Sequence, residues 1–341
     1  MPPLESTIDT TTMARQPQVG TFQSIWLFMC AIAYRYLCEI IFFQFKIRDR
    51  KFWAAQKPDR IQSYLERPTL RHHIFIPASH HEGQKHPVFI LIGGVAFILG
   101  SPTLDHAQAR FLADRHGYLV VALSYRRAPE HRFPTAIHDV AAVVSAVLND
   151  ESLPIDCSKV VVGGVSSGAS IALAVAQLEE LKGRISALVA FQPLTDRSGA
   201  IRGEYPKVMP WGGPDDMEKT RTLAEWAFPA PGQDLQEKLL SPYYATRVDI
   251  PQPLCLITSS ADMLCQEGYL MASKLADRKP NNELNGAWEQ NGVKYWCAKD
   301  MPHSWTHFWV QLKGEWRKKQ LQAQDEAWNE VTVWLDKILY K

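Results

Sequence analysis

Short runs of apolar residues alternate along most of the chain with segments of helical periodicity. The apolar runs predict seven strands, at residues 73–76, 88–92, 118–125, 159–165, 187–192, 253–259 and 293–298. The segments between them predict helices at residues 103–116, 134–149, 167–182 and 266–277. Strands that are apolar on both faces and are separated by helices are typical of a parallel sheet that is covered on both sides. The pattern therefore predicts an α/β fold with a mostly parallel central sheet and helices on both faces.

The C-terminal segment predicts one further helix, over residues 317–340. Its large apolar residues recur at intervals of three, four or seven, at Leu321, Trp328, Val331, Leu335 and Ile338. This spacing places them on one side of a helix, so we expect that side to be buried.

Two regions lack the alternation of strands and helices. Residues 1–70 are predicted to form an N-terminal helical cap region, and residues 71–341 the main α/β domain. Within that domain, residues 200–250 are rich in Pro, Gly and Trp, and we interpret them as an insertion between strands. We expect this insertion and the N-terminal helices to cover the functional site together.

The segment from Phe22 to Phe45 is apolar and long enough to span a membrane. Arg35 and Glu39 lie in its middle, where charges would be costly in a bilayer, and their spacing allows them to pair on one helix face. We favour a cap helix, and a membrane anchor is the alternative. The basic residues that follow, from Lys46 to Lys51, suit either interpretation.

Composition narrows the class of protein. Hydrophobic residues make up 46% of the chain and charged residues 21%, and the net charge is +1. These values are ordinary for a protein with a large core, and they give no basic surface for nucleic acid and no acidic tail. We therefore expect a small-molecule ligand and no nucleic-acid partner. The 11 tryptophans suit an apolar or aromatic ligand, or equally a well-filled core.

The six cysteines are scattered and form no pattern with metal-ligand spacing. We expect neither a metal nor another cofactor. The N-terminus has no basic stretch before a short apolar run, as a secretory signal would have. The cysteines are accordingly interpreted as reduced thiols of an intracellular, cytoplasmic protein.

The most informative motif runs from Gly164 to Gly168 and has the form GxSxG. The motif alone is weak evidence, but here it follows a strand rich in valine and begins a helix. That is the context of a nucleophile elbow, a tight turn that exposes a serine hydroxyl at the carboxyl end of a strand. The helix N-terminus behind the turn favours developing negative charge. Ser166 is therefore the candidate nucleophile.

A serine nucleophile needs a base and an acid that orients the base. Asp262 follows the predicted strand 253–259, and His303 follows the next one. Both positions are loops at the sheet edge where the serine emerges, in the chain order serine, acid, histidine. An N-cap role for Asp262 and the use of His307 in place of His303 are the alternatives.

Three stretches together resemble the hormone-sensitive-lipase branch of the α/β-hydrolases. "SYRRAPEHRFPTAIHDV" at residues 124–140 is similar to that branch's consensus over almost its whole length. "DMLCQEG" and "MPHSW" are similar to the segments that carry its acid and its histidine. The resemblance covers about residues 70–310 and implies an α/β-hydrolase fold with a helical cap. It also implies a catalytic triad of Ser166, Asp262 and His303.

The chain departs from that branch at its oxyanion hole. The branch carries His-Gly-Gly-Gly after its second core strand, whereas this chain has Gly93, Gly94, Val95 and Ala96. The resemblance implies oxyanion donors among the backbone N–H groups of Gly94, Val95, Ala96 and Ser167. Because two of the glycines are replaced by residues with a Cβ, we expect an altered oxyanion hole that limits the activity on generic esters.

Three hypotheses for function follow. The first is a carboxylesterase that cleaves an ester with an apolar or aromatic part. The second is an enzyme of natural-product biosynthesis, part of secondary metabolism, that uses the same residues for acyl transfer, lactone opening or cyclisation. The third is a non-catalytic ligand receptor, against which the complete set of Ser166, Asp262 and His303 argues. The sequence defines neither the substrate nor the oligomeric state.

Overall fold

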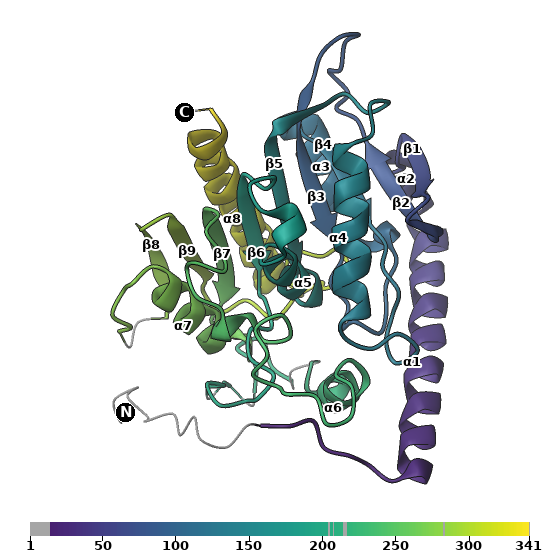
Figure 1. The fold of residues 1–341 in the computed structure, drawn as a ribbon, viewed down its shortest axis with the longest axis vertical. Coiled ribbons are helices and arrows are strands. Elements are labelled where there is room, and N and C mark those ends of the chain that lie inside the picture. The colour runs from purple at the N-terminus through teal and green to yellow at the C-terminus, as the bar shows by residue number, and fades with distance from the viewer. Residues whose placement is uncertain (1–13, 204, 207, 214–216, 282–283, 341) are drawn as a thin grey trace.

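The computed structural model describes residues 14–203, 205–206, 208–213, 217–281 and 284–340. In this part of the chain one nine-stranded sheet forms the centre of the molecule (Figure 1). Its strands are β1 (Arg60–Tyr64), β2 (Arg67–Phe75), β3 (His86–Ile92), β4 (Leu119–Leu123), β5 (Ile155–Val165), β6 (Ala187–Phe191), β7 (Leu254–Ser259), β8 (Gly286–Gln290) and β9 (Val293–Ala298).

The spatial order of the strands is β1-β2-β4-β3-β5-β6-β7-β9-β8. The pairs between β4 and β9 are parallel, whereas β1, β2 and β8 pair in the antiparallel direction at the two edges. The predicted α/β class and the mostly parallel sheet are thus confirmed.

Helices cover both faces of the sheet. The principal ones are α3 (His106–His116), α4 (Thr135–Leu148), α5 (Ser167–Val175), α7 (Cys265–Leu275) and α8 (Glu315–Leu339). The core on one face includes residues of α4, α5 and α7, and the core on the other includes residues of α3 and α8. Strand β3 shows why, because Val88 and Ile90 contribute to the first core and Phe89 and Leu91 to the second. Successive side chains of a strand point to opposite faces, so a buried strand must be apolar throughout.

All seven predicted strands are present, but two edge strands were missed. The missed strands are β1, in which three of five residues are exposed, and β8, which has no fully buried residue. Edge strands have one face in solvent, so their apolar signal is weak. The sheet begins at Arg60, within the region assigned to the N-terminal helices.

The predicted helix at residues 167–182 is also shorter than expected. Helix α5 ends at Val175, and the next N–H groups, of Gln177 and Leu178, bond three residues back. A short 3-10 helix, η2 (Glu179–Leu181), follows. Two other 3-10 helices, η1 (Pro102–Asp105) and η3 (Pro242–Tyr244), precede α3 and β7.

Three helices lie outside the sheet layers, in the regions predicted to form the cap. They are α1 (Thr21–Arg48) and α2 (Arg50–Ala55) from the N-terminal region and α6 (Glu218–Ala227) from the insertion between β6 and β7. Figure 1 shows α1 along one side of the molecule, with α6 beyond the carboxyl ends of the strands, and α1 contacts α6.

Candidate active site

The turn between β5 and α5 holds Ser166 in a backbone conformation with φ 54° and ψ −123°. A non-glycine residue rarely adopts such a positive φ, and strain of this kind is characteristic of functional turns. The neighbouring glycines allow the strands to approach. A Cβ on Gly164 would lie 2.4 Å from the carbonyl oxygen of Ile92, and one on Gly168 would lie 2.0 Å from it. The GxSxG spacing is therefore a steric requirement of the elbow.

Asp262 and His303 meet beyond the ends of two neighbouring parallel strands, β7 and β9. Nδ1 of His303 lies 2.8 Å from Oδ2 of Asp262. The carboxylate is buried, and its Oδ1 accepts a hydrogen bond of 2.9 Å from the N–H of Leu264 just before α7. Asp262 thus contacts the imidazole and also holds the turn before α7, but it is not the N-cap considered as an alternative, because the N-cap of α7 is Leu264.

Ser166 and His303 line the same cavity, which has a volume of about 680 Å³. Among the described residues, no direct hydrogen bond joins the two side chains. Catalytic hydrogen bonds are often long in an unliganded enzyme and tighten with substrate. The structure therefore brings the predicted nucleophile, base and acid to one place, with the acid–base pair already formed.

Gln192 belongs to this arrangement and was missed by sequence analysis. It follows β6, is fully buried and has φ 48°. Its Nε2 donates to Oδ2 of Asp262 at 2.9 Å and also lies 3.1 Å from the carbonyl of Pro302. Its Oε1 accepts from the N–H of Ser304 at 2.8 Å. One side chain therefore ties the acid to the residues on both sides of His303. The only sequence signal was a polar residue at the carboxyl end of an apolar strand.

The loop after β3 lies against the elbow, as expected for an oxyanion loop. Gly94 is essential to this contact, because a Cβ there would lie 1.7 Å from the carbonyl oxygen of Val165. However, the N–H of Val95 donates a hydrogen bond of 3.0 Å to Oγ of Ser167, so it is not free to bind an oxyanion. In the part of the chain that the structure describes, the N–H groups of Gly94, Ala96 and Ser167 have no hydrogen-bond partner. Ala96 has φ 56°, so its Cβ does not prevent the turn but strains it.

The predicted oxyanion set therefore needs one correction. Gly94, Ala96 and Ser167 retain N–H groups that can serve as donors, whereas Val95 does not in this conformation. The physical reason is the hydroxyl of Ser167, which accepts the hydrogen bond of the Val95 N–H.

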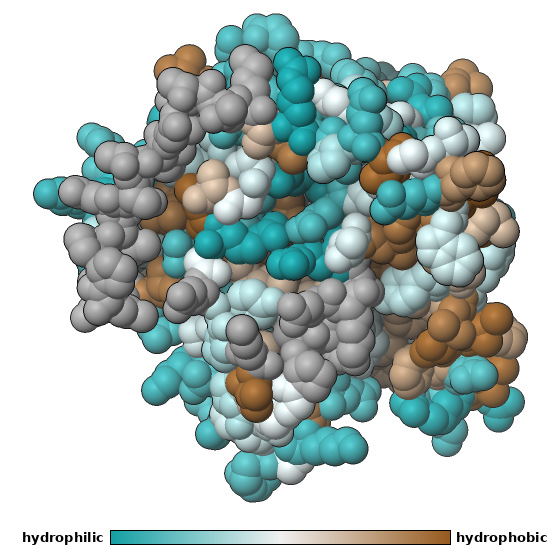
Figure 2. Space-filling model, turned by 90° about the horizontal axis from the view of Figure 1, so that it is seen from below, coloured by the Kyte–Doolittle hydropathy of each residue, from teal (hydrophilic) through white to brown (hydrophobic). Residues whose placement is uncertain are grey.

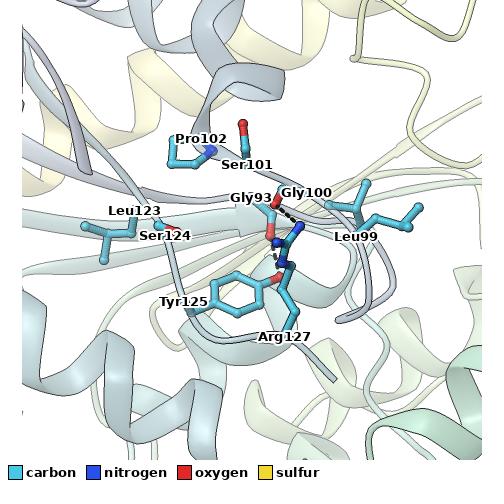
Figure 3. A pocket seen from close by; sticks show the side chains of 10 residues that line it. Gly93, Leu99, Gly100, Ser101, Pro102, Leu123, Ser124, Tyr125 and Arg127 are labelled. Atoms are coloured by element: carbon cyan, nitrogen blue, oxygen red, sulfur yellow. Dashed lines mark hydrogen bonds between the residues drawn. The ribbon is translucent and has the colours of Figure 1, made fainter. Parts of the chain in front are cut away.

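Behind the loop, Tyr125 and Arg127 support its backbone (Figure 3). The hydroxyl of Tyr125 donates a hydrogen bond of 3.0 Å to the carbonyl oxygen of Gly93. Nη1 of Arg127 donates a hydrogen bond of 3.3 Å to the carbonyl oxygen of Gly100. Burial raises the pKa of Tyr125 to about 12, so its hydroxyl keeps its proton and remains a donor. Both residues come from the stretch 124–140 that carried the family resemblance, which gives that stretch a role in positioning the loop.

The position of the missing family histidine is occupied by Gly93. A Cβ on Gly93 would lie 2.5 Å from Oδ2 of Asp105, so the carboxylate fills the space that a side chain would need. Oδ1 of Asp105 in turn lies 3.3 Å from Nε2 of His307, which is fully buried. His307, the competitor of His303, thus has its own carboxylate partner away from Ser166.

Helix α1 is attached to the oxyanion loop through arginine contacts. Nε of Arg35 donates a hydrogen bond of 2.8 Å to the carbonyl oxygen of Ile98, and Nη2 of Arg35 lies 2.7 Å from Oε2 of Glu130. Glu39 pairs instead with Arg127 at 3.1 Å. The expected pairing of Arg35 with Glu39 is therefore wrong, because each residue has an opposite charge on the main domain.

The cavity wall is mostly apolar and aromatic. Helix α1 contributes Tyr34, Cys38 and Phe42, and the insertion contributes Trp211 and Met217. The segment between His303 and α8, together with the first turn of α8, adds a third part of the wall, which comprises Ser304, Trp309, Val310, Gln311, Leu312, Lys313 and Trp316. Burial raises the pKa of the Cys38 thiol, so this sulfur stays protonated beside the cavity. Residues from both regions predicted to form the cap thus line the same cavity as Ser166.

No group of three or more His, Cys, Asp or Glu side chains that could hold a metal occurs among the described residues. All six cysteines are free, and the Sγ atoms of Cys265 and Cys297 lie 3.8 Å apart.

With fold and site defined, the class is clear: an α/β-hydrolase fold with a serine elbow and a His–Asp pair. The sequence pattern of the alpha/beta hydrolase fold family matches residues 88–306, more than half of the chain. The chain belongs to this family, and its resemblance to the esterase-like, hormone-sensitive-lipase branch is confirmed.

Similar proteins include esterases and enzymes of other kinds. An arylesterase of Saccharolobus solfataricus is 30% identical over 54% of this chain, a match that spans 60% of the arylesterase. A 2-hydroxyisoflavanone dehydratase of Glycine max is 30% identical over 31% of this chain and 38% of the dehydratase. The solved structure of a hyperthermophilic esterase of Pyrobaculum calidifontis has a TM-score of 0.64 at 22% identity, covering 85% of this chain and 91% of that one. This last likeness concerns the fold alone.

Proposed function

We propose that this protein is a serine hydrolase that cleaves carboxylic esters with an apolar or aromatic part. The observation that carries the proposal is the His303–Asp262 pair, which borders the same cavity as the strained Ser166. The proposal draws support from the related arylesterase and from the mostly apolar, aromatic wall of the cavity.

In the proposed reaction Ser166 Oγ attacks the ester carbonyl carbon while Nε2 of His303 accepts the hydroxyl proton. Asp262 holds the imidazole through Nδ1 and stabilises the cation that forms. The proton then passes to the leaving alcohol oxygen as the ester C–O bond breaks. Water, deprotonated by His303, attacks the acyl-serine and releases the acid, which restores the Ser166 hydroxyl.

The tetrahedral intermediate needs N–H donors near its oxyanion. Gly94, Ala96 and Ser167 carry the candidate donors, and the α5 N-terminus contributes a favourable dipole. A donor of this kind contributes about 10²–10³-fold in rate. With Val95 engaged elsewhere, we expect modest turnover of simple esters.

The experiment is to measure p-nitrophenyl ester hydrolysis and fluorophosphonate labelling for the wild type, Ser166→Ala and His303→Asn. Both substitutions should reduce kcat by about 10⁴-fold or more, and Ser166→Ala should abolish labelling. Ser158→Ala, an exposed serine at the start of β5, is the matched control and should change neither. Wild-type protein that is neither labelled nor active on any ester would contradict the proposal and favour a ligand receptor.

A second candidate is acyl transfer or another reaction on a natural-product intermediate. It is favoured by the Ser167–Val95 hydrogen bond, which reduces the number of free oxyanion donors, and by the similarity to a dehydratase. Adding an apolar alcohol to the ester assay distinguishes the two. Transfer predicts an ester of the added alcohol as the main product, whereas hydrolysis predicts the free acid.

A further inference from the structure

Helix α1 has two different apolar sides, and only one of them is used by the fold. The inner side carries the cavity-lining residues Tyr34, Cys38 and Phe42, with Ala31 and Arg35 buried between α1 and the main domain. The outer side carries nine large hydrophobic residues that are each more than half exposed. This outer stripe consists of Phe22, Ile25, Trp26, Met29, Tyr36, Leu37, Ile40, Phe43 and Ile47.

The outer stripe is free of charge along its length. The charged side chains between Phe22 and Phe43 are those of Arg35 and Glu39, which pair with Glu130 and Arg127 of the main domain. Of the nine stripe residues only Trp26 and Tyr36 have a polar side-chain atom. Protein interfaces carry many hydrogen bonds and a polar rim, so this surface is poorly suited to a second protein.

The hydropathy of helix α1 suits contact with lipid. Among the described residues α1 is the one helix that is long and apolar enough to cross a membrane, with a mean hydropathy of 1.7. A core helix of that hydropathy would be mostly buried, but only 11% of this segment is. Figure 2 shows hydrophobic side chains gathered at the right-hand edge of the molecule, the side on which Figure 1 places α1.

The orientation follows from the contacts in the middle of the helix. Arg35 donates to the carbonyls of Ile98 and Ala128, which fixes the centre of α1 against the oxyanion loop and its neighbour. A helix held there cannot cross a bilayer without drawing the polar domain into it. Exposed Arg48, Arg50 and Lys51 follow the stripe at its C-terminal end, where they can contact anionic headgroups.

We propose that α1 lies in the plane of a membrane surface, with its outer stripe in the lipid and its inner side forming a wall of the active-site cavity. The occupant of the stripe is an anionic phospholipid bilayer. A second consequence rests on the proposed function. In this orientation the cavity lies one helix diameter, about 10 Å, from the lipid. Apolar esters dissolved in the bilayer are therefore the substrates that we expect the enzyme to cleave.

The test is flotation of the full chain with vesicles of phosphatidylcholine and phosphatidylserine, in the absence of detergent. The wild type should float with the vesicles. Trp26→Glu combined with Ile40→Glu should weaken binding about 100-fold or more, because both side chains lose their apolar burial and gain charge. Leu321→Glu combined with Val333→Glu is the matched control on α8, where both residues are similarly exposed, and should bind as the wild type does.

Four outcomes would overturn the proposal. The first is wild-type protein that does not float with the vesicles, and the second is an equal loss of binding in the α8 control. The third is a dimer, detected by light scattering, that the α1 variant converts to a monomer without any vesicle binding, which would assign the stripe to a second copy. Resistance to alkaline carbonate extraction would instead show that α1 spans the bilayer, and this too would contradict the in-plane orientation.

A soluble ester and a vesicle-embedded ester, assayed in parallel, separate this proposal from the proposed function. The α1 variant should keep soluble-ester turnover and lose about 10-fold or more on the embedded ester. No turnover of either ester by any form, with flotation intact, would refute the esterase proposal and leave the membrane orientation standing.

Discussion

Nε2 of Gln192 donates a hydrogen bond of 2.9 Å to Oδ2 of Asp262, the same oxygen that faces Nδ1 of His303. The oxygen thus has two donors in fixed directions, one from β6's end and one from the histidine loop. Because Gln192 also accepts from Ser304, it connects the acid to the backbone that carries the base. The geometry of the pair depends on three chain segments and not on two.

Gln192→Leu should therefore lower kcat about 10-fold or more while KM changes little, since Gln192 does not line the cavity. The unpaired N–H of Ser304 should also cost about 1–3 kcal/mol in the free energy of unfolding. Steady-state kinetics and urea unfolding measure the two effects. Gln177→Leu, which removes hydrogen bonds to the carbonyls of Leu173 and Lys238, controls for stability alone. An equal fall in kcat for both variants would mean that Gln192 acts only on the fold.

Ser167→Ala should raise kcat/KM for a short p-nitrophenyl ester by about 10-fold. The substitution removes the acceptor of the Val95 N–H, which then can turn toward the oxyanion and add a donor. The control is Ser273→Ala, which removes a buried hydroxyl from α7 that is remote from the elbow. A lower rate in Ser167→Ala would show that the Ser167 hydroxyl holds the loop in its working conformation.

The proximity of Ser166, Asp262 and His303 could be predicted from the sequence because the carboxyl ends of neighbouring parallel strands must meet at one edge. It was insufficient for the Val95–Ser167 bond, which joins residues 72 positions apart and depends on the rotamer of one hydroxyl. Arg35 illustrates the same limit. Local spacing suggested Glu39 as its partner, whereas its actual partners lie 63 to 95 positions away on the main domain.

Gly94→Ala should abolish activity and lower the yield of folded protein. The added Cβ would lie 1.7 Å from the carbonyl oxygen of Val165, so either the oxyanion loop or the elbow must move. A displacement of the reacting groups by about 1 Å lowers the rate about 10²-fold. Gly20→Ala is the control, because no atom lies within 4 Å of the new Cβ. Expression, thermal unfolding and ester turnover test this, and wild-type activity in Gly94→Ala would refute the described contact between loop and elbow.

The stability of the protein should fall as the pH decreases from about 6.5 toward 4, because His73 and His106 are buried as a neutral pair. Nδ1 of His73 lies 2.7 Å from Nε2 of His106, and burial lowers the pKa of His73 to about 4 and that of His106 to about 3. In the unfolded chain both residues bind a proton below about pH 6.5, whereas in the folded protein they do not until the pH is much lower. Unfolding therefore takes up protons in this range. The free energy of unfolding has its largest value above about pH 6.5 and decreases as the pH falls below it. At pH 5 one such histidine lowers the free energy of unfolding by about 2 kcal/mol.

The variant His106→Gln tests this prediction. It keeps a hydrogen-bonding partner for His73 without the titration of His106, so its loss of stability between pH 7 and 5 should be about 2 kcal/mol smaller than that of the wild type. Urea unfolding at a series of pH values measures the difference, and the exposed His81→Gln should behave as the wild type does. Identical pH dependence in His106→Gln and wild type would show that the pair does not control acid stability.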